Sequence, residues 1–241
     1  MADSTLLIVS GIFVLAGLVK GMVGLGLPTI AMGLLCLFMQ PIEAAAFVVI
    51  PNALTNMWQM FAGPAFATLA RRLALLLMAV AVGTFASIGL LASGRGSIAT
   101  VLLGLVLMTY ALHGLISAQV QVNPKYERLA SPLVGAVSGL LNGATGVFVV
   151  PATPYLSSLR MGKDELIQSV GMLAFTAGIA LGAALWFSGR YSAADMSWMG
   201  LVPAVVGMYI GLRIRDRLNP QLFRRWFLVG LLLLGGYMLL R

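Results

Sequence analysis

The chain alternates between long apolar runs and short polar breaks, and the longest break has five runs on each side. The runs cover residues 6–19, 28–39, 44–61, 73–91, 98–117, 133–141, 147–156, 166–187, 196–212 and 222–240. Several approach the roughly 20 residues that a helix needs to cross a bilayer core of about 30 Å. Backbone groups that face lipid must be hydrogen-bonded within their own segment, and solid apolar runs do not alternate like barrel strands. The pattern therefore predicts an all-α polytopic membrane protein.

Composition agrees with a membrane-embedded chain and excludes several functions. Hydrophobic residues make up 60% of the chain and charged residues 9%, which no soluble globular domain resembles. No soluble basic domain carries the net charge of +8, so we expect a lipid bilayer as partner and no nucleic acid. One histidine and one cysteine cannot build a metal, thiol or catalytic site that needs several groups. We therefore expect no cofactor, no metal and no enzymatic activity.

The longest polar break, Gln119–Arg128, lies at the middle of the chain, where a linker between duplicated halves belongs. Glycines and prolines recur across it, 118 to 126 residues apart: Gly17 with Gly135, Gly21 with Gly139, Pro28 with Pro151, Gly83 with Gly207, and Gly104 with Gly230. We predict two homologous halves in one membrane domain, residues 1–118 and 131–241, joined by a linker at residues 119–130. Many secondary transporters are built from such repeats, with the substrate site where the repeats meet.

Each half begins with a glycine-rich segment that holds two apolar arms, each shorter than a full span. The arms are residues 6–19 and 28–39 in the first half, and residues 133–141 and 147–156 in the second. Each pair is either one broken span or a re-entrant hairpin that dips into the membrane and returns.

The positive-inside rule favours the hairpins, because the two alternatives distribute the basic residues differently. Broken spans give eight crossings and two halves of the same orientation, with 8 basic residues on one side of the membrane and 6 on the other. Hairpins give three crossings in each half, inverted halves and termini outside the cytoplasm. They place 11 basic residues on one side of the membrane and 3 on the other. The 11 are Arg71, Arg72, Lys125, Arg128, Arg160, Lys163, Arg213, Arg215, Arg217, Arg224 and Arg225.

Lys20 lies among glycines inside an apolar run, where a charge is costly unless it lines a cavity or meets a partner. Half-helices that end near the membrane midplane expose N–H groups at their starts, and such ends suit anions. We therefore expect an anion site between the two glycine-rich turns. The alternatives are that Lys20 snorkels to an interface and that the glycines only allow close helix packing.

The substrate-binding candidates are the polar and glycine residues of these turns together with a polar stripe on the third run: Lys20, Gly24, Gly26, Thr29, Asn52, Asn56, Gln59, Asn142, Gly143, Thr145 and Gly146. Asn52, Asn56 and Gln59 share one helical face at i, i+4, i+7 spacing. Interhelical hydrogen bonding explains the stripe as well as a substrate path does. No carboxylate lies mid-membrane, so ion coupling uses other groups or the flux follows its own gradient.

The two glycine-rich segments, each followed by proline, the central break and the segment Met161–Ser169 together resemble the TauE/SafE sulfite exporter family. The resemblance covers nearly the whole chain, although its glycine clusters are reduced to Gly24–Gly26 and Asn142–Gly146. It implies a secondary transporter in the cytoplasmic (inner) membrane of a prokaryote that exports sulfite, sulfoacetate or a related organosulfonate. Alternating access at the repeat interface is the expected mechanism. The competing hypothesis is a non-transporting membrane scaffold or assembly subunit.

Overall fold

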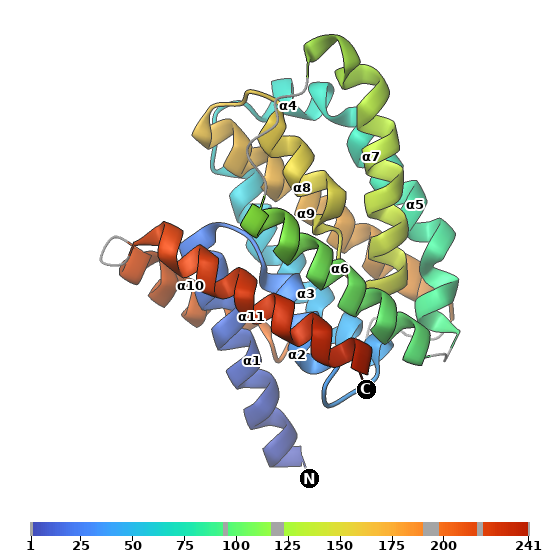
Figure 1. The fold of residues 1–241 in the computed structure, drawn as a ribbon, viewed down its shortest axis with the longest axis vertical. Coiled ribbons are helices and arrows are strands. Elements are labelled where there is room, and N and C mark those ends of the chain that lie inside the picture. The colour runs from blue at the N-terminus through green and yellow to red at the C-terminus, as the bar shows by residue number, and fades with distance from the viewer. Residues whose placement is uncertain (1, 94–95, 117–122, 190–197, 216–218, 241) are drawn as a thin grey trace.

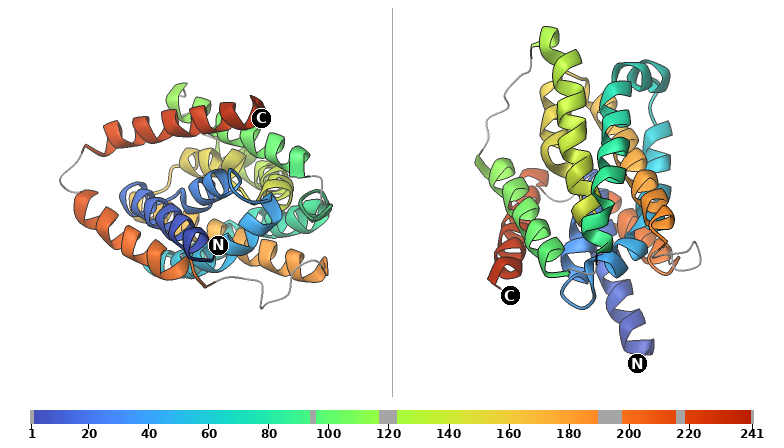
Figure 2. Two further views of the ribbon diagram at one scale, coloured as in Figure 1. Left: turned by 90° about the horizontal axis from the view of Figure 1, so that it is seen from below. Right: turned by 90° about the vertical axis from the view of Figure 1, so that its right-hand side faces the viewer.

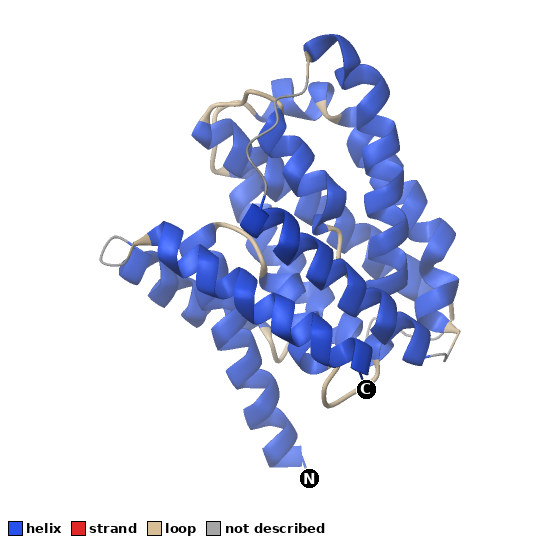
Figure 3. Cartoon of the chain, in the orientation of Figure 1, coloured by secondary structure: helices blue, strands red, loops and turns tan. Residues whose placement is uncertain are grey.

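The computed structural model describes residues 2–93, 96–116, 123–189, 198–215 and 219–240. Within these residues the chain forms eleven helices and no strand. Figures 1 and 3 show how the helices are arranged. The helices are α1 (Ala2–Val23), α2 (Leu27–Leu35), α3 (Pro41–Phe61), α4 (Phe66–Arg72), α5 (Ala74–Ala92), α6 (Gly96–Ile116), α7 (Pro124–Thr145), α8 (Val149–Ser158), α9 (Lys163–Phe187), α10 (Leu201–Arg215) and α11 (Pro220–Leu240).

Two sharp turns follow α1 and α7, and each turn leads into a short helix. After α1 the chain turns back, so that α2 runs in the opposite direction in Figure 1. Gly24 and Gly26 have φ of 86° and 109°, and Gly146 after α7 has φ of 73°. Only glycine adopts this left-handed region without strain. The N–H of Gly24 donates to the Lys20 carbonyl and that of Gly146 to the Asn142 carbonyl, both at 2.7 Å.

The prediction that both arms of each glycine-rich segment are shorter than a full span was wrong for α1, which contains a candidate span, whereas α7 is a long helix that does not contain one. Helices α1 and α7 have 22 residues each, whereas α2 has 9 and α8 has 10. Glycine inside a helix still makes its backbone hydrogen bonds, so Gly17 and Gly21 do not interrupt α1. Each long helix ends only where a glycine takes positive φ. Residues 124–130, which we expected to belong to the linker, form the first turns of α7.

Five of the described segments are long and apolar enough to cross a membrane: Thr5–Val23, Ala74–Ala92, Gly96–Ile116, Lys163–Phe187 and Gln221–Leu240. They differ from the six expected spans in three places. The first arm joins them because α1 is longer than expected. Helix α3 is not among the five candidate spans, because its polar stripe and Glu43 lower its hydropathy. Helix α10 has only 15 residues, and residues 190–197 before it lie outside the described part.

Glycines allow two pairs of helices to pack with their backbones in close contact. In the α1–α10 pair, a Cβ at Gly17 would overlap the Ala204 carbonyl, and one at Gly21 the Met208 carbonyl. The α5–α7 pair has the same design, because a Cβ at Gly139 would overlap the Val80 carbonyl and one at Gly143 the Thr84 carbonyl. These glycines therefore serve helix packing, as the competing interpretation of the sequence held.

The packing contacts correct the predicted alignment of the glycines. Gly17 and Gly139 make matching contacts and are 122 residues apart, as are Gly21 and Gly143. The predicted pairs, Gly17 with Gly135 and Gly21 with Gly139, are therefore one helical turn out of register. Composition alone could not choose between alignments, because glycine recurs every four residues on α7.

The remaining long helices cross in two further pairs, α3 with α9 and α6 with α11. Figure 2 shows α6 and α11 side by side on one flank of the molecule. Gly104 of α6 packs against Gly235 of α11, whereas Gly230 has open space around it. The surroundings of Gly104 and Gly230 therefore differ, and the predicted equivalence of these two glycines stays a prediction.

Candidate functional site

Lys20 is buried in the middle of the helix assembly, with only 4% of its surface exposed. Its ammonium donates to Asn56 Oδ1 at 2.6 Å and to Thr55 Oγ1 at 3.1 Å, both on α3. Both acceptors are neutral, and the ion pair found among the described residues joins Arg72 and Glu127 instead. The position excludes snorkelling to an interface. Lys20 is thus a buried amine held by neutral groups, with one N–H beyond the two acceptors that it contacts.

Hydrogen bonds through the polar stripe of α3 connect Lys20 of α1 with α9. Asn56 Nδ2 donates to Asn52 Oδ1 and to the Asn52 carbonyl, both at 2.7 Å. Asn52 Nδ2 then donates to the Ala174 carbonyl of α9 at 3.1 Å. Lys20, Asn56 and Asn52 therefore form one hydrogen-bonded chain, and each member orients the next.

Gln59, the last member of the stripe, lies at the first glycine-rich turn. Its Nε2 donates to the Gly24 carbonyl at 3.2 Å and to the Ile167 carbonyl of α9 at 2.9 Å. The side chain thereby ties the turn to both α3 and α9. Its contacts fit the packing interpretation of the stripe better than a direct contact with substrate.

Asn142 provides a second polar centre, on α7. Its Nδ2 donates to Thr84 Oγ1 of α5 at 3.1 Å and to the Ala177 carbonyl of α9 at 2.9 Å. The Ala177 carbonyl lies about one helical turn along α9 from the Ala174 carbonyl that Asn52 contacts. The polar groups of the two glycine-rich segments therefore meet α9 at adjacent turns.

Thr145 and Gly146 shape the second turn and do not contact Lys20. Thr145 Oγ1 donates to the Leu141 carbonyl at 2.7 Å and accepts from the Val147 N–H at 3.3 Å. A Cβ at Gly146 would press on the Met32 side chain of α2, whereas one at Gly26 would meet Phe227 of α11. The two turns thus have different neighbours.

Two threonines in the short helices keep buried hydroxyls without a hydrogen-bond partner. They are Thr29, in the first turn of α2, and Thr153 of α8. A buried hydroxyl is costly unless it forms a hydrogen bond, and no described protein group offers one to these two. Thr29 is the one candidate from the sequence with this free hydrogen-bonding capacity.

Lys20 and Asn142 have similar positions relative to the two glycine-rich turns. Lys20 and Asn142 each accept the N–H of a positive-φ glycine four residues later, and they are 122 residues apart. Each also contacts a central helix, Lys20 at Thr55 of α3 and Asn142 at Ala177 of α9. Ser138 lies 118 residues after Lys20, the spacing of the predicted glycine pairs, but its Oγ accepts from the Ala152 N–H of α8.

Reasoning from the sequence missed Thr55 and Thr84 as members of these polar centres. Thr55 lies beside Asn56 in the stripe, so its position next to the candidates was the signal that could have included it. Thr84 follows Gly83 in a strongly apolar run and gave no such signal. No group of three His, Cys, Asp or Glu side chains that could hold a metal occurs among the described residues.

Comparison with known proteins gives one family. The family described as Sulfite exporter TauE/SafE has a sequence model that matches residues 9–238 of the 241. The search of curated proteins and the search of solved structures returned no match. The matched range contains both glycine-rich turns and every hydrogen bond of the two polar centres.

Proposed function

Because this chain belongs to the sulfite exporter TauE/SafE family, we propose that it is a secondary transporter that exports a small sulfur-containing anion such as sulfite or an organosulfonate. One observation carries the proposal beyond the family. Lys20 is a buried amine without a carboxylate partner in the described part of the chain. An isolated buried cation is costly, and an incoming oxyanion is the partner that offsets that cost.

The substrate would bind at Lys20 and displace part of its hydrogen bonding. An oxyanion accepts charge-assisted hydrogen bonds more strongly than a neutral amide oxygen does, so it competes for the Lys20 ammonium with Asn56 Oδ1. Asn52 Nδ2 has one N–H beyond the one that it donates to Ala174, and the Thr29 hydroxyl has no partner among the described residues. Asn142 contributes the polar centre of the second half. Gly24, Gly26, Gly143 and Gly146 shape the turns and the close packing around these groups.

We further propose that the two halves are inverted repeats that move against each other in alternating access. The matching contacts 122 residues apart in α1 and α7 support the repeat. Figure 1 supports the inversion, because α1 begins at the lower end of the molecule and α7 at the upper end. The α1–α2 and α7–α8 pairs would be the re-entrant hairpins. The site would open to either side when one repeat rocks against the other.

The basic residues support an orientation in the cytoplasmic membrane. Helix α4, the start of α7 and the start of α9 all lie at the upper end in Figure 1. They carry Arg71 and Arg72, Lys125 and Arg128, and Lys163 respectively. The positive-inside rule places this end in the cytoplasm and the N-terminus outside it.

Anion binding to purified protein tests the function directly. Thermal denaturation is measured with sulfite, sulfonates, carboxylates and phosphate. We expect sulfite or a sulfonate to raise the melting temperature of the wild type and of Lys163→Met, which removes an exposed lysine. Lys20→Met should abolish that shift, because it removes the buried charge and keeps an apolar side chain of similar length. An unchanged shift in Lys20→Met removes Lys20 from the site, and a wild type that responds to no anion favours a scaffold.

A further inference from the structure

A cavity of about 350 Å³ lies at the upper end of the molecule, away from the Lys20 network. It is formed where the end of α4, the start of α5 and the start of α7 meet, as Figure 1 shows for these helices. Its lining residues are Arg71, Arg72, Leu75, Glu127, Arg128 and Ser131. The proposed export function assigns no role to this cavity.

One wall of the cavity is already paired and therefore fixed. Arg72 donates to both carboxylate oxygens of Glu127, at 2.6 and 2.8 Å, and to the Leu159 carbonyl at 3.1 Å. The hydrogen bond with Glu127 is the main reason why the pKa of Arg72 is raised. Ser131 Oγ lies 2.8 Å from the Tyr155 hydroxyl. These groups form a hydrogen-bonded polar frame along one wall of the cavity.

Arg71 and Arg128 supply the free charge of the cavity. Both side chains are exposed, and among the described residues neither forms an ion pair. Three arginines against one glutamate leave the lining with a net charge of +2. Because Glu127 is already bound to Arg72, it does not neutralise the other two guanidinium groups. Arginine forks of this kind match the oxygens of phosphate and similar oxyanions.

The position of the cavity relative to the candidate membrane spans indicates the source of such an anion. The membrane-crossing candidate Ala74–Ala92 begins two residues after Arg72, so the arginines lie where the apolar span ends. Leu75 lines the cavity and is 47% exposed, and the exposed Met78 and Val82 follow it along α5. We propose that this cavity binds a tetrahedral oxyanion between Arg71 and Arg128, as presented by the phosphate of an anionic phospholipid whose acyl chains lie along α5.

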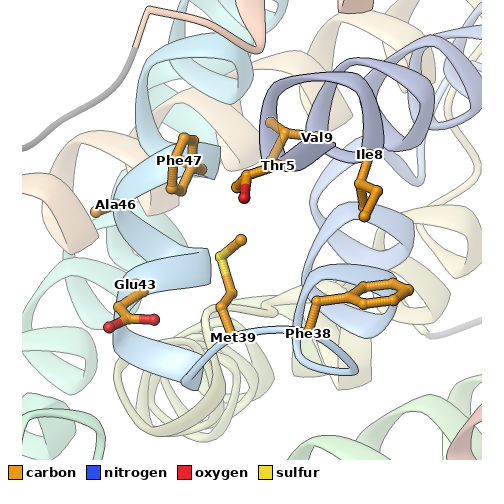
Figure 4. A pocket seen from close by; sticks show the side chains of 8 residues that line it. All are labelled: Thr5, Ile8, Val9, Phe38, Met39, Glu43, Ala46 and Phe47. Atoms are coloured by element: carbon orange, nitrogen blue, oxygen red, sulfur yellow. The ribbon is translucent and has the colours of Figure 1, made fainter. Parts of the chain in front are cut away.

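The opposite end of the molecule has a cavity of different chemistry. Figure 4 shows this second cavity, of about 300 Å³, between the start of α1 and the start of α3. Glu43 is its one charged lining residue, and apolar side chains such as Phe38 and Phe47 dominate the rest. An oxyanion would be repelled there. Of these two cavities, therefore, the one that suits an oxyanion is at the end of the molecule that also carries Lys125 and Lys163.

Lipid-dependent stability of the purified, delipidated protein tests this site. Melting temperature is measured with phosphatidylglycerol, with zwitterionic phosphatidylcholine and with inorganic phosphate. The test variant is Arg71→Gln/Arg128→Gln, and the matched control is Arg224→Gln/Arg225→Gln, which removes the same charge from α11. We expect phosphatidylglycerol to stabilise the wild type and the control more than phosphatidylcholine does, and we expect the test variant to lose that difference.

Each outcome has a definite consequence. If inorganic phosphate stabilises the protein as strongly as phosphatidylglycerol, and only with Arg71 and Arg128 present, the site stands and its ligand is a free oxyanion. If the test variant responds to both ligands like the wild type, the proposal is overturned. Should the glutamine variant unfold, Arg71→Lys/Arg128→Lys keeps the charges without the guanidinium forks, and an unchanged affinity for phosphatidylglycerol would overturn the proposal. Lys20→Met should leave all these responses intact, which separates this site from the export site.

Discussion

At the scale of single residues, Asn56 determines how Lys20 presents its charge. The Asn56 oxygen holds the ammonium at 2.6 Å, and its amide nitrogen is bound by Asn52. The side chain is therefore oriented from both ends. Because the oxygen carries no charge, Lys20 keeps its attraction for an anion while its position is fixed.

Replacement of Asn56 by aspartate tests this role. A carboxylate of the same shape would form an ion pair with Lys20 and neutralise the charge that, in the proposed site, attracts the substrate. We expect Asn56→Asp to weaken anion affinity at least about tenfold, or about 1.4 kcal/mol, as measured by ligand titration of the purified protein. Gln40→Glu adds the same charge at an exposed position and should bind like the wild type. Retained affinity in Asn56→Asp would show that the substrate does not meet Lys20.

The spacing of polar residues predicted part of this network and could not predict the rest. Asn52 and Asn56 share a helical face, and the sequence alone shows that. The Ala174 and Ala177 carbonyls belong to apolar stretches, and they become partners only because α9 crosses α3 and α7 at those turns. Backbone acceptors leave no trace in the amino-acid sequence, so the link between the two polar centres was not predictable.

At the scale of helices, close packing of α5 against α7 depends on glycines that face a backbone carbonyl. Gly139→Ala would place a methyl group against the Val80 carbonyl, whereas Gly230→Ala meets open space. We expect the first change to lower stability by about 1–3 kcal/mol, the usual cost of overpacking, and the second to be neutral or slightly stabilising. Thermal denaturation of the two variants beside the wild type measures the difference. Equal melting temperatures would contradict the packing role.

Glycine content predicted the turns but misplaced the helix boundaries around them. Positions 24, 26 and 146 take positive φ and end or begin helices, as the glycine-rich segments suggested. Gly17, Gly21 and Gly139 lie inside regular helix and serve close contacts instead. The same residue type does both because it lacks a Cβ, and only the tertiary neighbours decide which use applies. The short lengths of α2 and α8 followed from the sequence, since their apolar runs are short.

At the scale of the whole molecule, the charge distribution and the course of the chain support the same orientation. The elements that carry Arg71, Arg72, Lys125, Arg128 and Lys163 gather at one end, and the start of α1 lies at the other (Figure 1). The loop from α2 to α3 also lies at the N-terminal end, because α2 runs back along α1. A hairpin therefore keeps residues 4 and 40 on one side of the membrane, whereas a broken span would separate them.

Cysteine labelling in intact cells measures that difference. Single cysteines are introduced as Ser4→Cys, Gln40→Cys and Thr68→Cys in a Cys36→Ala background, and each is treated with a membrane-impermeant thiol reagent before and after permeabilisation. We expect Ser4→Cys and Gln40→Cys to react from outside the cell, and Thr68→Cys to react only after permeabilisation, because the proposed hairpin topology requires α3 to cross the membrane between Gln40 and Thr68. If Ser4→Cys and Gln40→Cys react from opposite sides, α1 and α2 form one broken span. The halves would then share one orientation, and the rocking of inverted repeats would have to be abandoned.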